Sequence, residues 1–320
     1  MGRERDGVKT DQLIGERGFI MKETAKWEIF ELILTSDAKM DNPFIEADVY
    51  AVFTHKDHVD TVDGFYDGIV DGRHIWRVRF APYKEGKWQY RTVSNIPDLD
   101  GKEGSLLCVP AVSRGGLTVN PRFGNWFFRE DGSPQFIVNE GWYPHPGNGH
   151  ELEFEDVDFP QPSEEDMNAY FKILSDHGVN MVVDIAQLYA RQSEITDPSY
   201  RWPWKVIDAK HNKIDRDRFN LDFYQRMDRT MAYAKEKNLF FAMELLYDNS
   251  VVRPREWSMH PLNVNNGGWL EGNEHGTGWD VMFNLENKEH VTYMSRYLRY
   301  TIARFAAYWN VFWCIGSENG

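Results

Sequence analysis

The pattern of apolar and polar residues changes near residue 120. Before this point the two kinds of side chain alternate in short runs, most clearly over residues 74–80. Such alternation predicts strands with one buried face, and Asp-Gly pairs between residues 63 and 72 predict turns. Short strands at this spacing predict an antiparallel β-sandwich over residues 26–116. Residues 1–25 are expected to form a flexible N-terminal tail.

After residue 120, short apolar runs alternate with amphipathic segments. The amphipathic segments predict helices over 163–178, 220–237 and 287–307, the first opened by a capping box of Ser163 and Asp166. The apolar runs predict buried strands over 134–142, 179–185, 239–248 and 310–316. Strand–helix alternation of this kind predicts a parallel sheet with both faces covered. No G-x-G-x-x-G follows the first strand, which disfavours a dinucleotide-binding fold.

Each of the four predicted strands is followed by, or carries, a polar group. The strand-end candidates are Asn139, Glu140, Trp142, Asp184, Glu244, Ser317 and Glu318. In a (β/α)₈ barrel the carboxyl ends of the strands meet at the face that holds the active site, so this pattern favours a shared site. A carboxylate after a strand is also a common helix cap or turn former. Glu244 lies within an apolar run, where a structural salt bridge is the alternative to a functional role.

The segment 257–280 is long, rich in Asn, Gly and Trp, and lacks an apolar period. Long segments of this kind are often functional loops. Asn265, Asn266 and Trp269 are therefore expected to bind substrate, with an ordered surface loop as the alternative. The residues around His145 and Glu151 match no standard metal spacing, so a solvated acidic loop is expected there, and no metal or other cofactor is predicted.

Composition narrows the classes of partner. The net charge of −14 argues against nucleic acid and against anionic membrane surfaces, both of which need basic patches. No apolar stretch reaches the length of a membrane span, and the two cysteines imply no disulfide framework. The aromatic share of 15% fits either large cores or carbohydrate binding. The charged N-terminus has no secretory h-region, so a cytoplasmic setting is expected.

Two sets of motifs resemble known families. The first set, "NPF" at 42–44, "GFYDG" at 64–68, "RVRFAP" at 77–82 and "GKWQYRTVSN" at 86–95, resembles the Ig-like domain that precedes many bacterial glycoside hydrolase barrels, including apiosidase-like ones. The second, "LRYTIARFAAYWNVFWCIGSENG", resembles helix 3 and strand 4 of a clan A glycoside hydrolase. The resemblance implies that residues 117–320 form strands 1–4 of a (β/α)₈ barrel, with an oligo- or polysaccharide as substrate.

By this resemblance Glu318 is the general acid/base of a retaining glycosidase. Ser317 stands where the family has an asparagine that contacts the sugar 2-hydroxyl. The family's nucleophile ends strand 7, and only four barrel strands are predicted here, so the chain is expected to be a truncated and inactive fragment. A half-barrel that dimerises, a subunit that pairs with a partner, and a non-catalytic carbohydrate-binding protein remain alternatives. Oligomeric state stays open.

Overall fold

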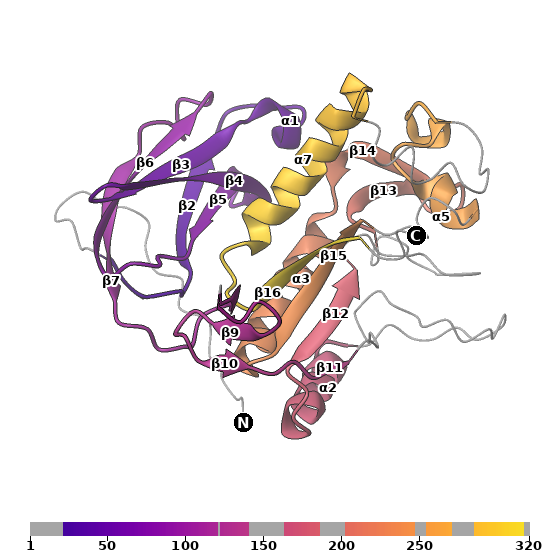
Figure 1. Ribbon diagram of the computed structural model, residues 1–320. Coiled ribbons are helices and arrows are strands. Elements are labelled where there is room, and N and C mark those ends of the chain that lie inside the picture. Colours follow the sequence, from indigo (N-terminus) through magenta and orange to yellow (C-terminus); the bar gives the residue numbers. More distant parts are fainter. Residues whose placement is uncertain are drawn as a thin grey trace, which may run out of the picture.

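The structure is a computed structural model that describes residues 22–120, 122–140, 163–185, 202–246, 254–270 and 285–316. A seven-stranded sheet, hereafter the N-terminal sheet, occupies residues 22–109 (Figure 1). Its strands, in spatial order, are β1 (Lys22–Ala25), β7 (Glu103–Val109), β6 (Gly86–Ser94), β3 (Val49–His55), β4 (His58–Val70), β5 (Arg73–Phe80) and β2 (Phe30–Ser36). All neighbours pair antiparallel except β1 and β7.

The long strand β4 curls this sheet into a nearly closed, barrel-like form. Its first half pairs with β3 and its second half with β5, with a register shift between Tyr66 and Gly68. The two halves of the sheet enclose one core, in which Phe53 of β3 stacks on Phe80 of β5 at 4.1 Å between ring centroids. The strand alternation expected over 74–80 is present, since Trp76, Val78 and Phe80 all belong to this core.

Strand β1 covers residues that the sequence places in the flexible tail. Lys22–Ala25 pairs in parallel with β7, and Thr24 is buried. The sequence of this strand carries only one apolar residue, so alternation could not reveal it. The rest of the expected tail lies outside the described residues.

A small antiparallel sheet follows the N-terminal sheet. It consists of β8 (Leu117–Val119), β9 (Phe127–Arg129) and β10 (Pro134–Gln135). The single strand expected over 134–142 is therefore divided, because β10 belongs to this sheet and β11 (Asn139–Glu140) belongs to the next one. The Gly115-Gly116 pair before β8 is tightly packed: Gly115 has a φ of +74°, and a Cβ there would lie 2.8 Å from Trp27.

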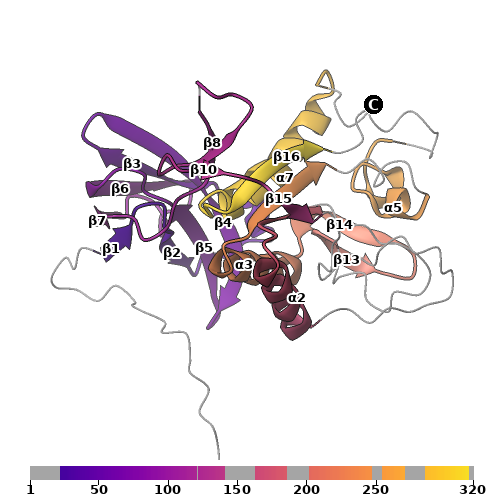
Figure 2. The same cartoon turned by 60° about the horizontal axis from the view of Figure 1, so that its bottom comes forward.

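Four parallel strands form the centre of the second part. Their order is β11, β12 (Met181–Ile185), β15 (Phe240–Leu246) and β16 (Val311–Gly316), so neighbours in sequence are neighbours in space. Figure 1 shows β12, β15 and β16 side by side, and Figure 2 shows β15 beside β16 from a second direction. The parallel, sequential arrangement predicted from strand–helix alternation is confirmed.

Three helices connect these strands: α2 (Glu164–Asp176), α3 (Leu221–Glu236) and α7 (Lys288–Phe305). Each begins at a residue whose side chain accepts a backbone N–H, as a stable N-terminus requires; these residues are Ser163, Asn220 and Asn287. The capping box of Ser163 and Asp166 is confirmed. No helix within the described ranges has the length and apolar character needed to cross a bilayer.

Two further segments follow carboxyl ends of the parallel strands. A hairpin of β13 (Trp204–Asp208) and β14 (Lys213–Phe219) lies between β12 and α3. The helix α5 (Pro254–Met259) and the 3₁₀ turn η2 (Val264–Asn266) lie between β15 and α7. Buried residues from both segments join those of α2, α3, α7, β12 and β15 in the largest hydrophobic cluster. A short helix, α1 (Pro43–Glu46), links the N-terminal sheet to this cluster through Phe44.

Candidate active site

The candidate site is the edge of the sheet at which the four parallel strands end. β11 ends at Glu140, β12 at Ile185, β15 at Leu246 and β16 at Gly316. In α/β folds built from parallel strands, ligands bind outside the carboxyl ends of the strands. Polar side chains at this edge are therefore the first candidates for binding and catalysis.

The strand register assigns the residues near this edge to two faces. Glu244 is in register with Ile185 on one side and Cys314 on the other, while Met243 is in register with Asp184 and Trp313. Met243 packs in the cluster formed with the helices, whereas Phe240 and Ala242 form a separate cluster on the opposite face. Because side chains alternate along a strand, Glu244 lies on the face that is turned away from the helices.

Glu244 is the carboxylate that the structure places at this edge most clearly. Its exposed fraction is 3%. Burial raises the pKa of the Cys314 thiol, and the negative charge of Glu244 raises it further, which places the two groups close together. A buried carboxylate in this position can accept hydrogen bonds from hydroxyl groups or orient a neighbouring group.

Asn139 and Glu140 fall on different faces. Asn139 is in register with Met181, which belongs to the cluster of Phe240 and Ala242, whereas Glu140 is in register with Val182, which packs against the helices. Burial raises the pKa of Tyr170 on α2, and the charge of Glu140 contributes to the same shift. The structure therefore places Glu140 near α2, and it does not bring Glu140 and Glu244 to one face.

The remaining strand-end candidates are placed only in part. The backbone of Asp184 lies in β12, in register with Met243. Trp142, Ser317 and Glu318 lie outside the described residues, as does the acidic loop with His145 and Glu151. Within the described ranges, no group of three or more His, Cys, Asp or Glu side chains has the arrangement of a metal site.

Asn265 and Asn266 hold the 254–270 segment against the β13–β14 hairpin. The side-chain oxygen of Asn266 accepts from the backbone N–H of Ile214 at 2.9 Å, and its amide donates to the carbonyl of Ser258 at 2.8 Å. Asn265 donates to the same carbonyl at 3.0 Å and accepts from Lys213 Nζ at 2.5 Å. Both amides thus build the local structure of the loop, and the binding role predicted for them stays a prediction.

Trp269 is half-buried at the rim of this segment. Its ring packs against the main cluster, with the guanidinium of Arg216 at 5.8 Å from the ring centroid and the imidazole of His290 edge-on at the same distance. An aromatic ring that is fixed by a cation and by a second ring keeps a defined orientation. A fixed ring of this kind is suited to act as a binding platform.

Replacement of Asn266 by alanine tests the structural role of its amide. We expect a loss of about 1–3 kcal/mol in the free energy of unfolding, because the buried N–H of Ile214 loses its acceptor. Denaturant unfolding followed by circular dichroism measures this loss. Asn265→Ala is the matched control, with a smaller expected loss because this side chain is only partly buried. Equal, negligible losses for both variants would contradict the assigned role.

The sequence pattern did not predict a buried aromatic cluster that is formed by the β13–β14 hairpin, the residues just before it and the 254–270 segment. Trp202, Trp204 and His260 are fully buried, and the ring of Trp257 stacks on His260 at 5.4 Å. Burial, together with the nearby His290, lowers the pKa of His260 to about 3, so this imidazole is neutral near pH 7. These residues lie in segments without an apolar period, so their burial had no sequence signal beyond the abundance of tryptophan.

Exposed apolar side chains gather at the edge strand β16 of the parallel sheet, whereas Met181, Phe240 and Ala242 on the face opposite the helices are buried. On β16, Ile315 is 69% exposed, and Phe312 is 36% exposed and meets Phe127 of β9 edge-on at 6.1 Å; Phe136, which precedes β11, is 71% exposed. Further exposed apolar residues are Val119 at the end of β8 and Phe123 and Trp126 in the connection between β8 and β9. Exposed apolar surface of this kind marks a region that is usually covered by further protein or by a ligand.

Comparison with solved structures identifies relatives of this fold. A protein of Bacteroides vulgatus ATCC 8482, assigned provisionally to the glycoside hydrolases, is similar over 93% of this chain and 50% of its own, with a TM-score of 0.65 and 22% sequence identity. A family 5 glycoside hydrolase of the same organism and a β-mannanase of the blue mussel Mytilus edulis are more distant, with TM-scores of 0.37 and 0.34. The family 5 protein is 14% identical and covers 64% of this chain and 33% of its own; the β-mannanase is 13% identical and covers 64% and 46%.

The structural neighbours are thus glycoside hydrolases, and the first of them shares the fold of this chain. The chain spans half the length of that protein. The sequence profile of a domain of unknown function, DUF5060, matches residues 23–95, which lie in the N-terminal sheet. No curated protein matches the chain.

Proposed function

We propose that this chain is part of a retaining glycoside hydrolase, in which an Ig-like β-sandwich precedes the first four strands of a (β/α)₈ barrel. Glu318 is the general acid/base of the proposed enzyme, and the substrate is a plant or microbial oligo- or polysaccharide. The similarity to glycoside hydrolases concerns the fold, and the activity and its residues are what we propose in addition.

The observation that carries the proposal is the order of the parallel sheet. β11, β12, β15 and β16 are parallel and adjacent in sequence order, and the edge strand β16 carries the exposed apolar side chains of Phe312 and Ile315. This is the expected form of a barrel wall that further parallel strands would continue beyond β16. In such a wall, the position two residues beyond the end of β16 belongs to the same edge as Glu244.

The chemistry of glycoside cleavage suits the residue types at this edge. One carboxylic acid protonates the departing oxygen, and a second carboxylate attacks the anomeric carbon from about 5–5.5 Å away in retaining enzymes. Glu318 is proposed as the acid. Glu244 lies on the face turned away from the helices, where a carboxylate binds sugar hydroxyls, and Asn139, Asp184, Asn265, Asn266, Trp142, Trp269 and Ser317 are proposed as further substrate contacts.

The second carboxylate is proposed to lie in residues that follow Gly320 in a longer protein. Two observations support this: the chain corresponds to half the length of the Bacteroides protein with the same fold, and Phe312 and Ile315 on the edge strand β16 are exposed. The longer protein would supply the remaining strands, and with them the nucleophile.

An activity assay tests the proposal. Residues 1–320 and the protein extended by the residues that its gene encodes after Gly320 are compared on a panel of aryl glycosides and polysaccharides. We expect turnover with net retention of anomeric configuration, followed by NMR, from the longer protein alone. The shorter chain lacks the nucleophile and is expected to show none.

Three other results of the activity assay would each contradict a part of the proposal. Turnover by residues 1–320 alone would mean that the second carboxylate lies within this chain. Binding of a polysaccharide without turnover by either protein would favour the non-catalytic carbohydrate-binding alternative. Inversion of configuration would overturn the retaining mechanism while leaving Glu318 as a candidate acid.

A further inference from the structure

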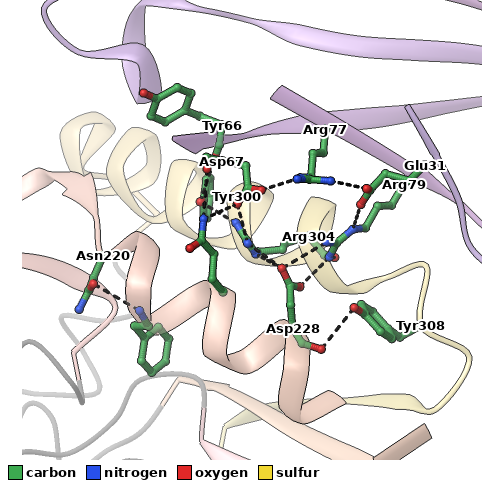
Figure 3. A network of polar contacts seen from close by, with 12 residues as sticks. Glu31, Tyr66, Asp67, Arg77, Arg79, Asn220, Asp228, Tyr300, Arg304 and Tyr308 are labelled. Atoms are coloured by element: carbon green, nitrogen blue, oxygen red, sulfur yellow. Dashed lines mark hydrogen bonds and ion pairs between the residues drawn. The ribbon is translucent and has the colours of Figure 1, made fainter. Parts of the chain in front are cut away.

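Six charged side chains meet where the N-terminal sheet packs on α3 and α7 (Figure 3). Three are carboxylates and three are guanidinium groups. They are Glu31 on β2, Asp67 on β4, Arg77 and Arg79 on β5, Asp228 on α3 and Arg304 on α7. We refer to this set as the charge ring, because its ion pairs close on themselves.

The ion pairs alternate in sign around the ring. Arg304 pairs with Asp67 at 2.7 Å and with Asp228 at 2.6 Å; Arg79 pairs with Asp228 at 2.6 Å and with Glu31 at 2.7 Å. Arg77 pairs with Asp67 at 2.5 Å and also with Glu31, which closes the ring. Each charge is therefore flanked by two opposite charges.

The ring is buried at Arg304, Asp67 and Arg79 and about one quarter exposed at Arg77 and Glu31. The side chain of Arg304 is 0% exposed and that of Arg79 is 8% exposed. Arg304 also donates to the hydroxyl of Tyr300, and Arg79 donates to the backbone carbonyl of Arg304 at 2.8 Å. Both guanidinium groups lie over the ring of Phe65, with 4.8 and 4.9 Å to its centroid.

The ion pairs stabilise the charged form of the buried carboxylate Asp67. Burial raises the pKa of the Asp67 carboxyl, but the charges of Arg304 and Arg77 more than offset it and hold the pKa below its ordinary value. A buried ion pair resists removal of one partner, because the other charge is left uncompensated in a region of low dielectric. Any change that removes one member of the ring while its partners stay buried is therefore strongly destabilising.

We infer that the charge ring joins the N-terminal sheet to α3 and α7 as one cooperative folding unit, and that the N-terminal sheet thereby fixes the position of α7. Around Arg79 and Asp67, the face of β4 and β5 outside their own core is an internal interface. Since α7 leads directly into β16, Arg304 and Asp228 act as positioning residues for the edge at which β16 ends. This inference concerns folding and does not depend on the proposed function.

Replacement of Arg304 tests the inference on the 320-residue chain. Arg304→Met leaves Asp67 and Asp228 buried without their shared partner, and we expect the melting temperature to fall by at least about 6 °C. Arg304→Lys keeps the charge but cannot hold both carboxylates in a fork, so a smaller fall is expected in a variant that still folds. Scanning calorimetry measures both.

Arg299→Met is the matched control, because Arg299 also joins α7 to β4. It pairs with Asp63 at 2.8 Å, but its side chain is 59% exposed. An exposed pair contributes little, so we expect a shift of less than about 2 °C. Equal shifts for the Arg304 and Arg299 variants would overturn the special role of the ring.

The shape of the thermal unfolding transition distinguishes cooperative folding of the two parts from a local effect on stability. We expect the unaltered chain to melt in one transition, with equal calorimetric and van't Hoff enthalpies, and Arg304→Lys to broaden or divide it. Hydrogen exchange should show β3 and α3 opening together in the unaltered chain. Two separate transitions in the unaltered chain, with independent exchange of these elements, would contradict the inference.

Discussion

Glu318→Gln in the extended protein is expected to lower kcat/KM on substrates with poor leaving groups by about 10²–10⁴-fold. Glutamine keeps the size and hydrogen-bonding capacity of the side chain but cannot donate a proton to the departing oxygen. Activated aryl glycosides depend little on protonation, so their cleavage should fall far less. Steady-state kinetics on one natural oligosaccharide and one activated aryl glycoside measure the difference.

A pH profile distinguishes loss of the acid from a general loss of structure. A general acid must be protonated, so activity declines as pH rises through its pKa; the glutamine variant should lose this alkaline limb. Glu236→Gln is the control, since Glu236 is exposed on α3 and pairs only with the neighbouring Lys237 among the contacts described. Unchanged kinetics for Glu318→Gln would remove Glu318 from the mechanism.

Trp204→Ala is expected to lower the free energy of unfolding by about 3–5 kcal/mol. Trp204 is fully buried, with its ring 5.5 Å from that of Trp202 and 5.2 Å from that of Tyr297. Its indole N–H has no acceptor among the described residues, so the loss reports packing and the cavity left behind. Urea unfolding monitored by circular dichroism measures it.

Ile207 on the same strand provides the matched control. Its side chain is 66% exposed, so Ile207→Ala should change stability by no more than about 0.5 kcal/mol. Trp204→Phe keeps part of the ring contact and should fall between the two. A loss for Trp204→Ala that does not exceed that of Ile207→Ala would mean that the hairpin is held by other contacts.

Helices and parallel strands were predictable because their signals are local. The capping box at Ser163 needs only four residues, and the apolar run of β15 identifies a buried strand without reference to its partners. Strand β13 is different: one face of its hairpin is buried by α7 and by the loop after β15, and both are distant in sequence. The sequence pattern therefore gave no sign of it.

Alternation of apolar and polar residues along a strand does not identify what covers the polar face of that strand. It places Arg77 and Arg79 opposite Trp76 and Val78, and the structure agrees. Period-two alternation does not say whether the second face meets water or another element, and here it meets α3 and α7. The same limit applies to Asn266, whose polarity is equally compatible with a ligand contact and with the buried loop contacts that it makes.

The charge ring has a consequence for how sequences of this kind can diverge. Asp228 and Arg304 on the helices pair with each other and also with Arg79 and Asp67 of the N-terminal sheet, so a change at one position is tolerated only with a matching change at another. Substitutions at these six positions should therefore be correlated among homologues. A chimera that exchanges the N-terminal sheet between two homologues should be viable only when both carry the same set of six charges.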